Sequence, residues 1–450
     1  MAVFVLCAWN PGSAVGSVTR APHVVGLIRA DHVRVYRSKT SHSSVLTVLV
    51  QETQVEVLQR GSFWTHIQFW NSLRGWVRSS DVVYRKPWAS VSTYRAPVIR
   101  YRVHATGPQP LQADGVVGTR SPLVSAPDGT QISFLPSGSR IVIRAWQQDA
   151  SGKVWYDARQ GWILAAAIRL SFPNPASQTM DGRPLWQSVA GKGMWLTLGT
   201  ITDSQPAAVV RAAARMGMTH LYVEAAISPL GFHGRNAVGP LIEAAHRSHL
   251  AVIAWVYPYL YDVAADVSLT RVVAAFRTPS GERFDGIAAD LERNFAPSTV
   301  HAYSQLVRAY LGNRELLVGV TYPPQSSPDY PFSEVARVYN AIAPMDYWHQ
   351  TNTVFGLEYG HMRYGFAYSY RYAEDSIRFI RKSVGNVPVV PIGQTFDNFG
   401  RLEMGPNAPS GAEIQGFLAG CRAAGAKGVS FFQWMTAQVD EWAVIAAFRL

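Results

Sequence analysis

The stretch FDGIAADLE, residues 284–292, decides the fold of the larger part of this chain. It is a short apolar run that ends in two acidic residues, and successive side chains of a β-strand point to opposite faces. Asp290 and Glu292 therefore share one face, while Ala289 and Leu291 pack on the other. We expect a buried strand over 285–292 whose carboxyl end presents two carboxyl groups side by side.

Seven further apolar runs of this kind flank the stretch, and segments with helical periodicity separate them. Such alternation is typical of successive βα units. Eight units predict an α/β fold, a (β/α)8 or TIM barrel, over residues 190–450. The other expected strands are 194–199, 220–225, 251–257, 316–322, 341–348, 387–394 and 428–434.

Two shorter segments before the barrel, 27–84 and 115–170, share one sequence plan. In each, strands with period-two alternation lead to an aromatic residue and then to a Gly-Trp pair. These positions are Trp64, Gly75 and Trp76 in the first segment, and Trp155, Gly161 and Trp162 in the second. The repetition predicts two small all-β domains, with linkers at 85–114 and 171–189.

The charge and cysteine content narrow the range of partners. Lys and Arg number 41 against 30 Asp and Glu, so the net charge of +11 favours an anionic partner such as an acidic wall polymer. The basic residues form no long run, so nucleic acid is not expected. Only Cys7 and Cys421 are present, which predicts no disulfide framework, no metal site and no cofactor. Cys421 shares a helical stripe with apolar residues and is expected in a core.

The first 26 residues contain an apolar run without a basic start, too short to cross a bilayer. We expect either that 1–26 is the remainder of a signal or anchor whose start was lost, or that the chain is not exported by a standard signal. No membrane-spanning segment is expected in this chain, and we expect a monomer that is secreted or lies at the cell surface.

Polar residues at the carboxyl ends of the barrel strands are the candidates for function, because such barrels place their chemistry there. Asp290 and Glu292 stand out, since two adjacent buried carboxyls cannot both ionise easily and one can remain a proton donor. The other candidates at strand ends are Glu224, Tyr257, Asp346, Tyr347, Gln394, Gln433 and Trp434.

The two small segments resemble bacterial SH3 domains. The matching residues are Arg37 and Ser38, 64–67 and 75–77 in the first copy, and Arg120 and Ser121, 155–158 and 161–163 in the second. The resemblance implies two SH3-like barrels that bind a cell-wall ligand.

The barrel segment resembles the chitinase-like family-eighteen glycoside hydrolases, whose fourth strand reads D-G-x-D-x-D-x-E. Asp285, Gly286, Asp290 and Glu292 match this pattern, and Ala288 stands where the family has Asp. The resemblance implies that Glu292 is the acid, that Asp290 orients the acetamido group of the substrate, and that Asp285 lies in the substrate site.

Two later motifs support the same resemblance. PMDYW, residues 344–348, is similar to the family's M-x-Y-D motif, which implies that Tyr347 lies beside the reacting sugar, with Trp348 in the place of the Asp and Asp346 before the tyrosine. GVSFFQW, residues 428–434, is similar to the last strand, which implies that Trp434 lies beneath the sugar.

The expected function is a wall-directed glycoside hydrolase that cleaves a β-linked N-acetylhexosamine polymer, peptidoglycan or chitin-like, by a substrate-assisted retaining mechanism. Two alternatives remain open. Glu224 or Asp346 could serve as a protein nucleophile opposite Glu292, or the barrel could bind glycan without cleaving it.

Overall fold

A computed structural model gives the three-dimensional structure of the chain. It describes residues 24–29, 33–49, 54–69, 73–85, 103–172, 182–203, 205–349, 364–396 and 408–449. The expected N-terminal signal or anchor at 1–26 lies almost wholly outside these residues.

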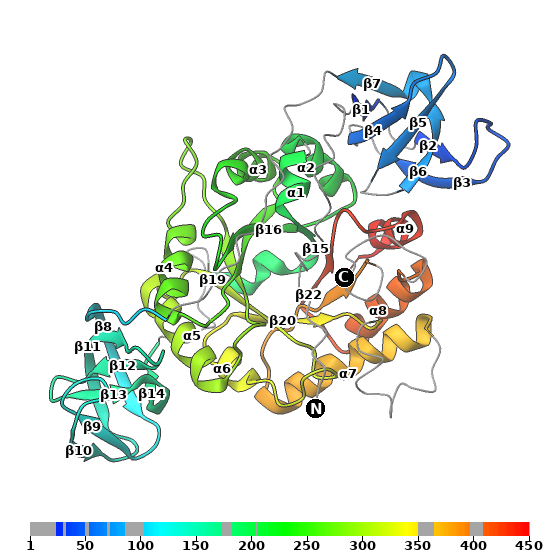
Figure 1. The fold of residues 1–450 in the computed structure, drawn as a ribbon. Helices are drawn as coiled ribbons and strands as arrows, with labels where there is room; N and C mark the ends of the chain where they lie inside the picture. Colours follow the sequence, from blue (N-terminus) through cyan, green and yellow to red (C-terminus); the bar gives the residue numbers. More distant parts are fainter. Residues whose placement is uncertain are drawn as a thin grey trace.

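Eight parallel strands form a closed barrel in chain order, β15 to β22, which confirms the predicted TIM barrel (Figure 1). The strands are β15 (Gly191–Leu196), β16 (His220–Ile227), β17 (Ala251–Tyr257), β18 (Gly286–Asp290), β19 (Leu316–Thr321), β20 (Ala341–Asp346), β21 (Ile392–Gln394) and β22 (Gly428–Phe432).

Strands β15 and β21 differ most from their expected bounds. Strand β15 begins earlier than predicted and includes Lys192, a charged residue that the search for apolar runs left out. Lys192 is buried, and its ammonium group donates to the carbonyl oxygens of Ile445, Ala446 and Phe448. Burial lowers the pKa of Lys192 to about 8. Strand β21 is short since prolines precede it within 387–394, and proline offers no N–H to a sheet.

Helices surround the barrel and pack their apolar stripes against it. They are α1 (Leu198–Asp203), α2 (Pro206–Arg215), α3 (Arg235–Arg247), α4 (Val263–Ala274), α5 (Pro297–Leu311), α6 (Phe332–Ala336), α7 (Phe366–Val384), α8 (Gly411–Ala423) and α9 (Val439–Ala447). Helix α8 begins with a capping box between Ser410 and Glu413. Cys421 is fully buried in α8, as expected.

The barrel has a second core inside its ring of strands. Alternate residues of the strands point inward, among them Trp195, Tyr222 and Ala288, while the intervening residues join the outer core beneath the helices. A 3₁₀ helix, η3 (Leu185–Val189), precedes β15 and adds Leu185 and Val189 to the inner core. The amino end of the barrel is therefore closed by apolar packing.

The two N-terminal segments form seven-stranded antiparallel sheets whose strand orders, β3-β2-β6-β5-β4-β1-β7 and β10-β9-β13-β12-β11-β8-β14, are identical position by position. This confirms the internal repeat. The first module contains β1 (Val24–Ile28), β2 (Val33–Tyr36), β3 (Val45–Leu49), β4 (Gln54–Gln59), β5 (Trp64–Phe69), β6 (Leu73–Arg78) and β7 (Val82–Arg85). The second contains β8 (Gln109–Val117), β9 (Ser121–Val124), β10 (Gln131–Leu135), β11 (Arg140–Gln148), β12 (Val154–Asp157), β13 (Trp162–Leu164) and β14 (Ile168–Leu170).

The second module begins inside the expected linker 85–114, since β8 starts at Gln109 and buries Leu111. Likewise, η3 falls inside the expected linker 171–189. The polar and proline-containing sequence before residue 115 hid the strand, because only alternate positions of β8 are buried.

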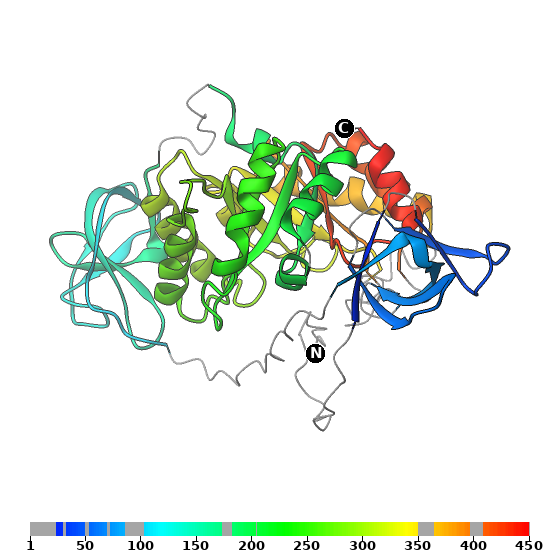
Figure 2. The ribbon, with the colours of Figure 1, turned by 90° about the horizontal axis from the view of Figure 1, so that it is seen from above.

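The second module is attached to helices α4 and α5 of the barrel. Trp146 Nε1 donates to Tyr310 Oη at 2.7 Å, and Gln148 Nε2 donates to Asp262 Oδ1 at 3.0 Å. Apolar residues of this module belong to the same continuous core as the barrel, whereas the first module has a core of its own. Figures 1 and 2 show the two modules on opposite sides of the barrel.

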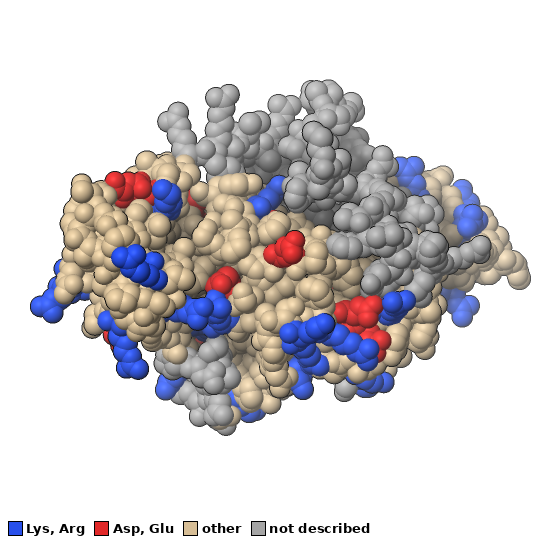
Figure 3. Space-filling view, turned by 90° about the horizontal axis from the view of Figure 1, so that it is seen from below, with Lys and Arg blue, Asp and Glu red and all other residues tan. Residues whose placement is uncertain are grey.

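Charge is dispersed over the described surface. On the face shown in Figure 3, Lys and Arg side chains are spread singly or in small groups and form no continuous basic band over the described residues. Of the helices that the structure describes, none combines the length and the apolarity needed to cross a bilayer.

Candidate active site at the carboxyl end of the barrel

The predicted acid pair lies at the carboxyl end of β18. Asp290 is the last residue of the strand and is 3% exposed, and Glu292 follows it with a partly exposed side chain. Ala289 and Leu291 pack in the outer core, so the expected alternation is correct. The pair thus lies at the carboxyl end of the barrel, with Asp290 more enclosed than Glu292.

Residues of the neighbouring strand β17 hold both carboxyl groups. Trp255 Nε1 donates to Asp290 Oδ2 at 2.9 Å, and Tyr257 Oη donates to Glu292 Oε2 at 3.3 Å. The other oxygen of the aspartate, Oδ1, is buried without a hydrogen-bond partner among the described residues. Ala288, which stands in place of the family's acidic residue, offers it none.

The surroundings of the pair favour protonated carboxyls. Burial raises the pKa of Asp290 well above its ordinary value, and the charge of Glu292 raises it further. Burial also raises the pKa of Glu292, although the side chain of Asp290 and the charge of Arg293 act in the opposite direction. Burial therefore favours retention of a proton by the pair, as a general acid requires.

Arg293 and Tyr259 belong to this site although neither was predicted. The Arg293 guanidinium lies over the Tyr259 ring, 4.9 Å from its centroid, and is hydrogen-bonded to the hydroxyls of Tyr257 and Tyr259. The only signal in the sequence is that Arg293 directly follows Glu292. The direction of the Arg293 side chain depends on Tyr259 in the loop after β17, and the sequence does not show that these two residues meet.

Aromatic rings form the wall of the barrel interior below the pair. Trp195 stacks on Tyr222 with centroids 4.2 Å apart and meets Trp255 edge-on at 5.3 Å. Tyr347 belongs to the same inner core, where its ring contacts Phe396 at 5.1 Å. Tyr347 therefore points to the interior of the barrel, and its place beside the substrate stays a prediction.

Trp434 does not lie where its resemblance implied. Its ring contacts Trp442 of α9 at 5.0 Å and packs against the outer core. Strand β22 ends at Phe432, so strand alternation no longer governs the direction of Trp434. Phe432, which belongs to the inner core, occupies the interior instead.

Asp346 and Trp348 also point away from the interior. Asp346 is fully buried and accepts a hydrogen bond from Ser376 of α7 at 2.7 Å, and burial raises its pKa well above the ordinary value. Trp348 Nε1 donates to Glu413 of α8 at 2.9 Å. Because Tyr347 points inward, its two neighbours must point outward, so neither lines the candidate site.

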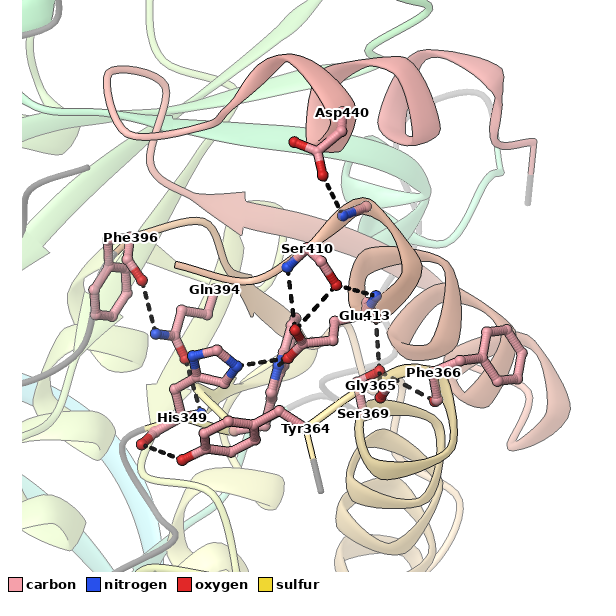
Figure 4. Close-up of polar contacts among 12 residues, drawn as sticks. His349, Tyr364, Gly365, Phe366, Ser369, Gln394, Phe396, Ser410, Glu413 and Asp440 are labelled. Carbon is pink, nitrogen blue, oxygen red and sulfur yellow. Dashed lines mark hydrogen bonds and ion pairs between the residues drawn. The ribbon is translucent and has the colours of Figure 1, made fainter. Parts of the chain in front are cut away.

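A buried ion pair fastens the end of β20 to α8 (Figure 4). His349 Nε2 lies 2.5 Å from Glu413 Oε2, and the His349 ring stacks on Tyr364 at 3.9 Å. Gln394 accepts from the backbone N–H of His349 at 3.1 Å and donates to the carbonyl of Phe396 at 2.8 Å. Gln394, predicted to contact substrate, therefore braces the backbone around the site.

Glu224 and Gln433 lie near the carboxyl ends of β16 and β22. Glu224 accepts from the Leu198 N–H at 2.8 Å and pairs with His233 at 2.9 Å, so each of its oxygens has a protein partner. Gln433 is 6% exposed, and its Oε1 has no hydrogen-bond partner among the described residues.

Asp285 lies at the wrong end of the barrel for substrate binding. It precedes β18, accepts from the Val252 N–H at 2.7 Å and pairs with His246 at 3.0 Å. Five residues separate it from Asp290, about 16 Å at the rise of a β-strand. Asp285 therefore serves the packing of the amino end.

No protein-family model matches the chain, and no curated protein matches it. Solved structures with a similar fold include the spore cortex-lytic enzyme SleL of Bacillus cereus, with 10% identity and a TM-score of 0.43 over 57% of this chain and 73% of that one. A class V chitinase from Pseudomonas fluorescens Pf-5 has 13% identity and a TM-score of 0.42 over 57% and 98%. The endo-1,4-beta-mannanase from Rhizomucor miehei has 10% identity and a TM-score of 0.40 over 58% and 90%. Similarity at this level is too low to bear on the chemistry of the site.

Proposed function

We propose that the barrel is a glycoside hydrolase that cleaves a β-linked N-acetylhexosamine polymer with the help of the substrate's own acetamido group. The observation that carries the proposal is the pair formed at the carboxyl end of β18 by the buried Asp290 and the partly exposed Glu292, where burial favours retention of a proton.

Each carboxyl has a distinct role in this mechanism. Glu292 donates its proton to the glycosidic oxygen as the bond to the anomeric carbon breaks. Asp290 accepts a hydrogen bond from the acetamido N–H, and its unpartnered Oδ1 is available for this contact. The acetamido carbonyl oxygen then attacks the anomeric carbon, and water, deprotonated by Glu292, opens the cyclic intermediate with retention of configuration.

The positions of the other carboxylates favour substrate assistance over a protein nucleophile. Asp346 is bonded to Ser376 outside the ring of strands, and both oxygens of Glu224 are engaged by Leu198 and His233. Trp255 and Tyr257 fix the orientation of the acid pair from β17. The polymer is expected to be peptidoglycan or a chitin-like glycan.

The proposal also gives the two N-terminal modules a role in binding. We infer that the two SH3-like modules hold a secreted or surface-located enzyme on the cell wall, because both repeat one strand order and precede the barrel in the chain. The net charge of +11 suits an anionic wall polymer.

Turnover of defined N-acetylhexosamine oligomers by the wild type and by Glu292→Gln tests the proposal. Loss of the general acid is expected to lower kcat by about 10²- to 10⁴-fold without loss of glycan binding. Equal turnover by both proteins would remove Glu292 from the mechanism. Binding by both without any product would favour a glycan-binding protein.

A further inference from the structure

Arg293 lies beside the proposed proton donor. It follows Glu292 in the chain, and its guanidinium bonds to Tyr257, whose hydroxyl in turn donates to Glu292. The guanidinium also lies over the ring of Tyr259. Tyr257 therefore links the guanidinium of Arg293 to Glu292, the proposed proton donor.

The charge of Arg293 lowers the pKa of the neighbouring Glu292, but the two side chains do not form a salt bridge. Arg283 pairs with Glu315 and Arg337 with Glu334, whereas no ion pair among the described residues includes Arg293. Its Nε is buried and has no hydrogen-bond partner there.

A guanidinium that forms no ion pair within the protein is suited to bind a carboxylate of a ligand. Its planar donor fork binds a carboxylate through two parallel hydrogen bonds, and such charge-assisted bonds are stronger than neutral ones. Tyr257 and Tyr259 restrict the rotation of the side chain, so little conformational entropy is lost on binding. A buried donor without a partner is costly, and a ligand acceptor would remove that cost.

We propose that Arg293 selects a carboxylate-bearing aminosugar polymer, such as one that contains the lactyl ether of muramic acid, over a neutral chitin-like polymer. The inference rests on the proposed function, because it assumes that sugars bind beside Asp290 and Glu292. It names the substrate class of the same site.

Three soluble oligomers of equal length test the inference. The first alternates N-acetylglucosamine with N-acetylmuramic acid and lacks peptide, the second is the same oligomer with its carboxyls converted to methyl esters, and the third is a chito-oligomer. Dissociation constants and kcat/KM are measured for the wild type, Arg293→Gln and Arg283→Gln. The last variant is a matched control, because Arg283 precedes the same strand at the opposite end and is paired with Glu315.

Arg293→Gln is expected to weaken binding of the carboxylate oligomer about 10- to 100-fold, the usual effect of losing a charge-assisted hydrogen bond. Binding of the ester and of the chito-oligomer should change less than about threefold, and the control should resemble the wild type throughout.

The outcomes separate this inference from the proposed function. Turnover of all three oligomers with an equal loss in Arg293→Gln would mean that Arg293 positions the acid pair, which overturns the inference and leaves the hydrolase intact. Selective binding of the carboxylate oligomer without turnover would retain the inference and overturn the hydrolase. Neither binding nor turnover would overturn both.

Discussion

An aspartate stands at each end of strand β18, but the two aspartates differ in burial and in their hydrogen-bond partners. At the carboxyl end, Asp290 is buried, its pKa is raised, and one oxygen lacks a partner. At the amino end, Asp285 is exposed and paired with His246, and the amino end of the barrel is closed by η3. Asp346 is equally buried and also has an oxygen without a hydrogen-bond partner among the described residues, but it points outward to Ser376. An aspartate in this barrel therefore becomes a candidate for chemistry only when burial is combined with an inward direction at the carboxyl end.

The largest expected effect comes from the matched variants Asp290→Asn and Asp285→Asn. Removal of the carboxyl group at the carboxyl end should lower kcat/KM by about 10²- to 10³-fold, because the group that orients the acetamido N–H beside Glu292 is lost. The same change at the amino end should cost less than about threefold. Turnover assays on one oligomer compare the two. Similar losses in both variants would show that the ends do not differ in function.

A second test concerns Asp266, which is buried at the carboxyl end and accepts from the Leu260 N–H at 2.7 Å and from Ser228. Burial raises its pKa to about 7. The folded state therefore holds a proton that the unfolded state has released, so the stability of the wild type should fall as the pH rises from about 4 to 7, by at most about 1.4 kcal/mol per pH unit.

Asp266→Asn should lack this dependence. Urea unfolding of both proteins between pH 4 and 8 measures it. Unfolding free energies that run parallel across this range would mean that Asp266 titrates normally in the folded state.

The smallest effect is expected at the amino end, in His246→Gln. Hydrogen bonds to Asp285, and a smaller contribution from Glu282, raise the pKa of His246 to about 9. The folded state thus favours the charged imidazole, which adds stability below pH 6.5 that is lost as the pH rises through 9. Because the group is partly exposed, the variant should lose only ~0.5 kcal/mol at pH 6 and nothing above pH 10. Thermal unfolding at both pH values measures the difference, and an equal loss at both would assign it to packing.

Much of the site could be predicted from strand periodicity. The same rule that turns Asp290 and Glu292 toward one face also turns Asp346 and Trp348 away from Tyr347. Asp346 was nevertheless predicted in the site from its place at a strand end, and Trp348 from the motif resemblance. The length of β18 likewise separates Asp285 from the acid pair. These three residues show that geometry within one strand is a better guide than a motif match or a place at a strand end alone.

Other features depend on contacts between distant segments. Arg293 is directed by Tyr257 and Tyr259, and Trp434 by Trp442 of the last helix. His301 of α5 is 7% exposed because Ile168 of the second module accepts from it at 2.7 Å. Sequence patterns cannot show such contacts, since they report only the neighbours along one helix or strand.

The sequence by itself determined the eight βα units, the repeated β modules and the acid pair at the end of β18. These follow from apolar periodicity, which each segment carries locally. Only the tertiary structure decided which polar side chains enter the barrel interior, which carboxyl oxygen remains without a partner, and which module shares the core of the barrel. Those properties depend on burial, and burial is set by residues that lie far apart in the chain and meet only when it folds.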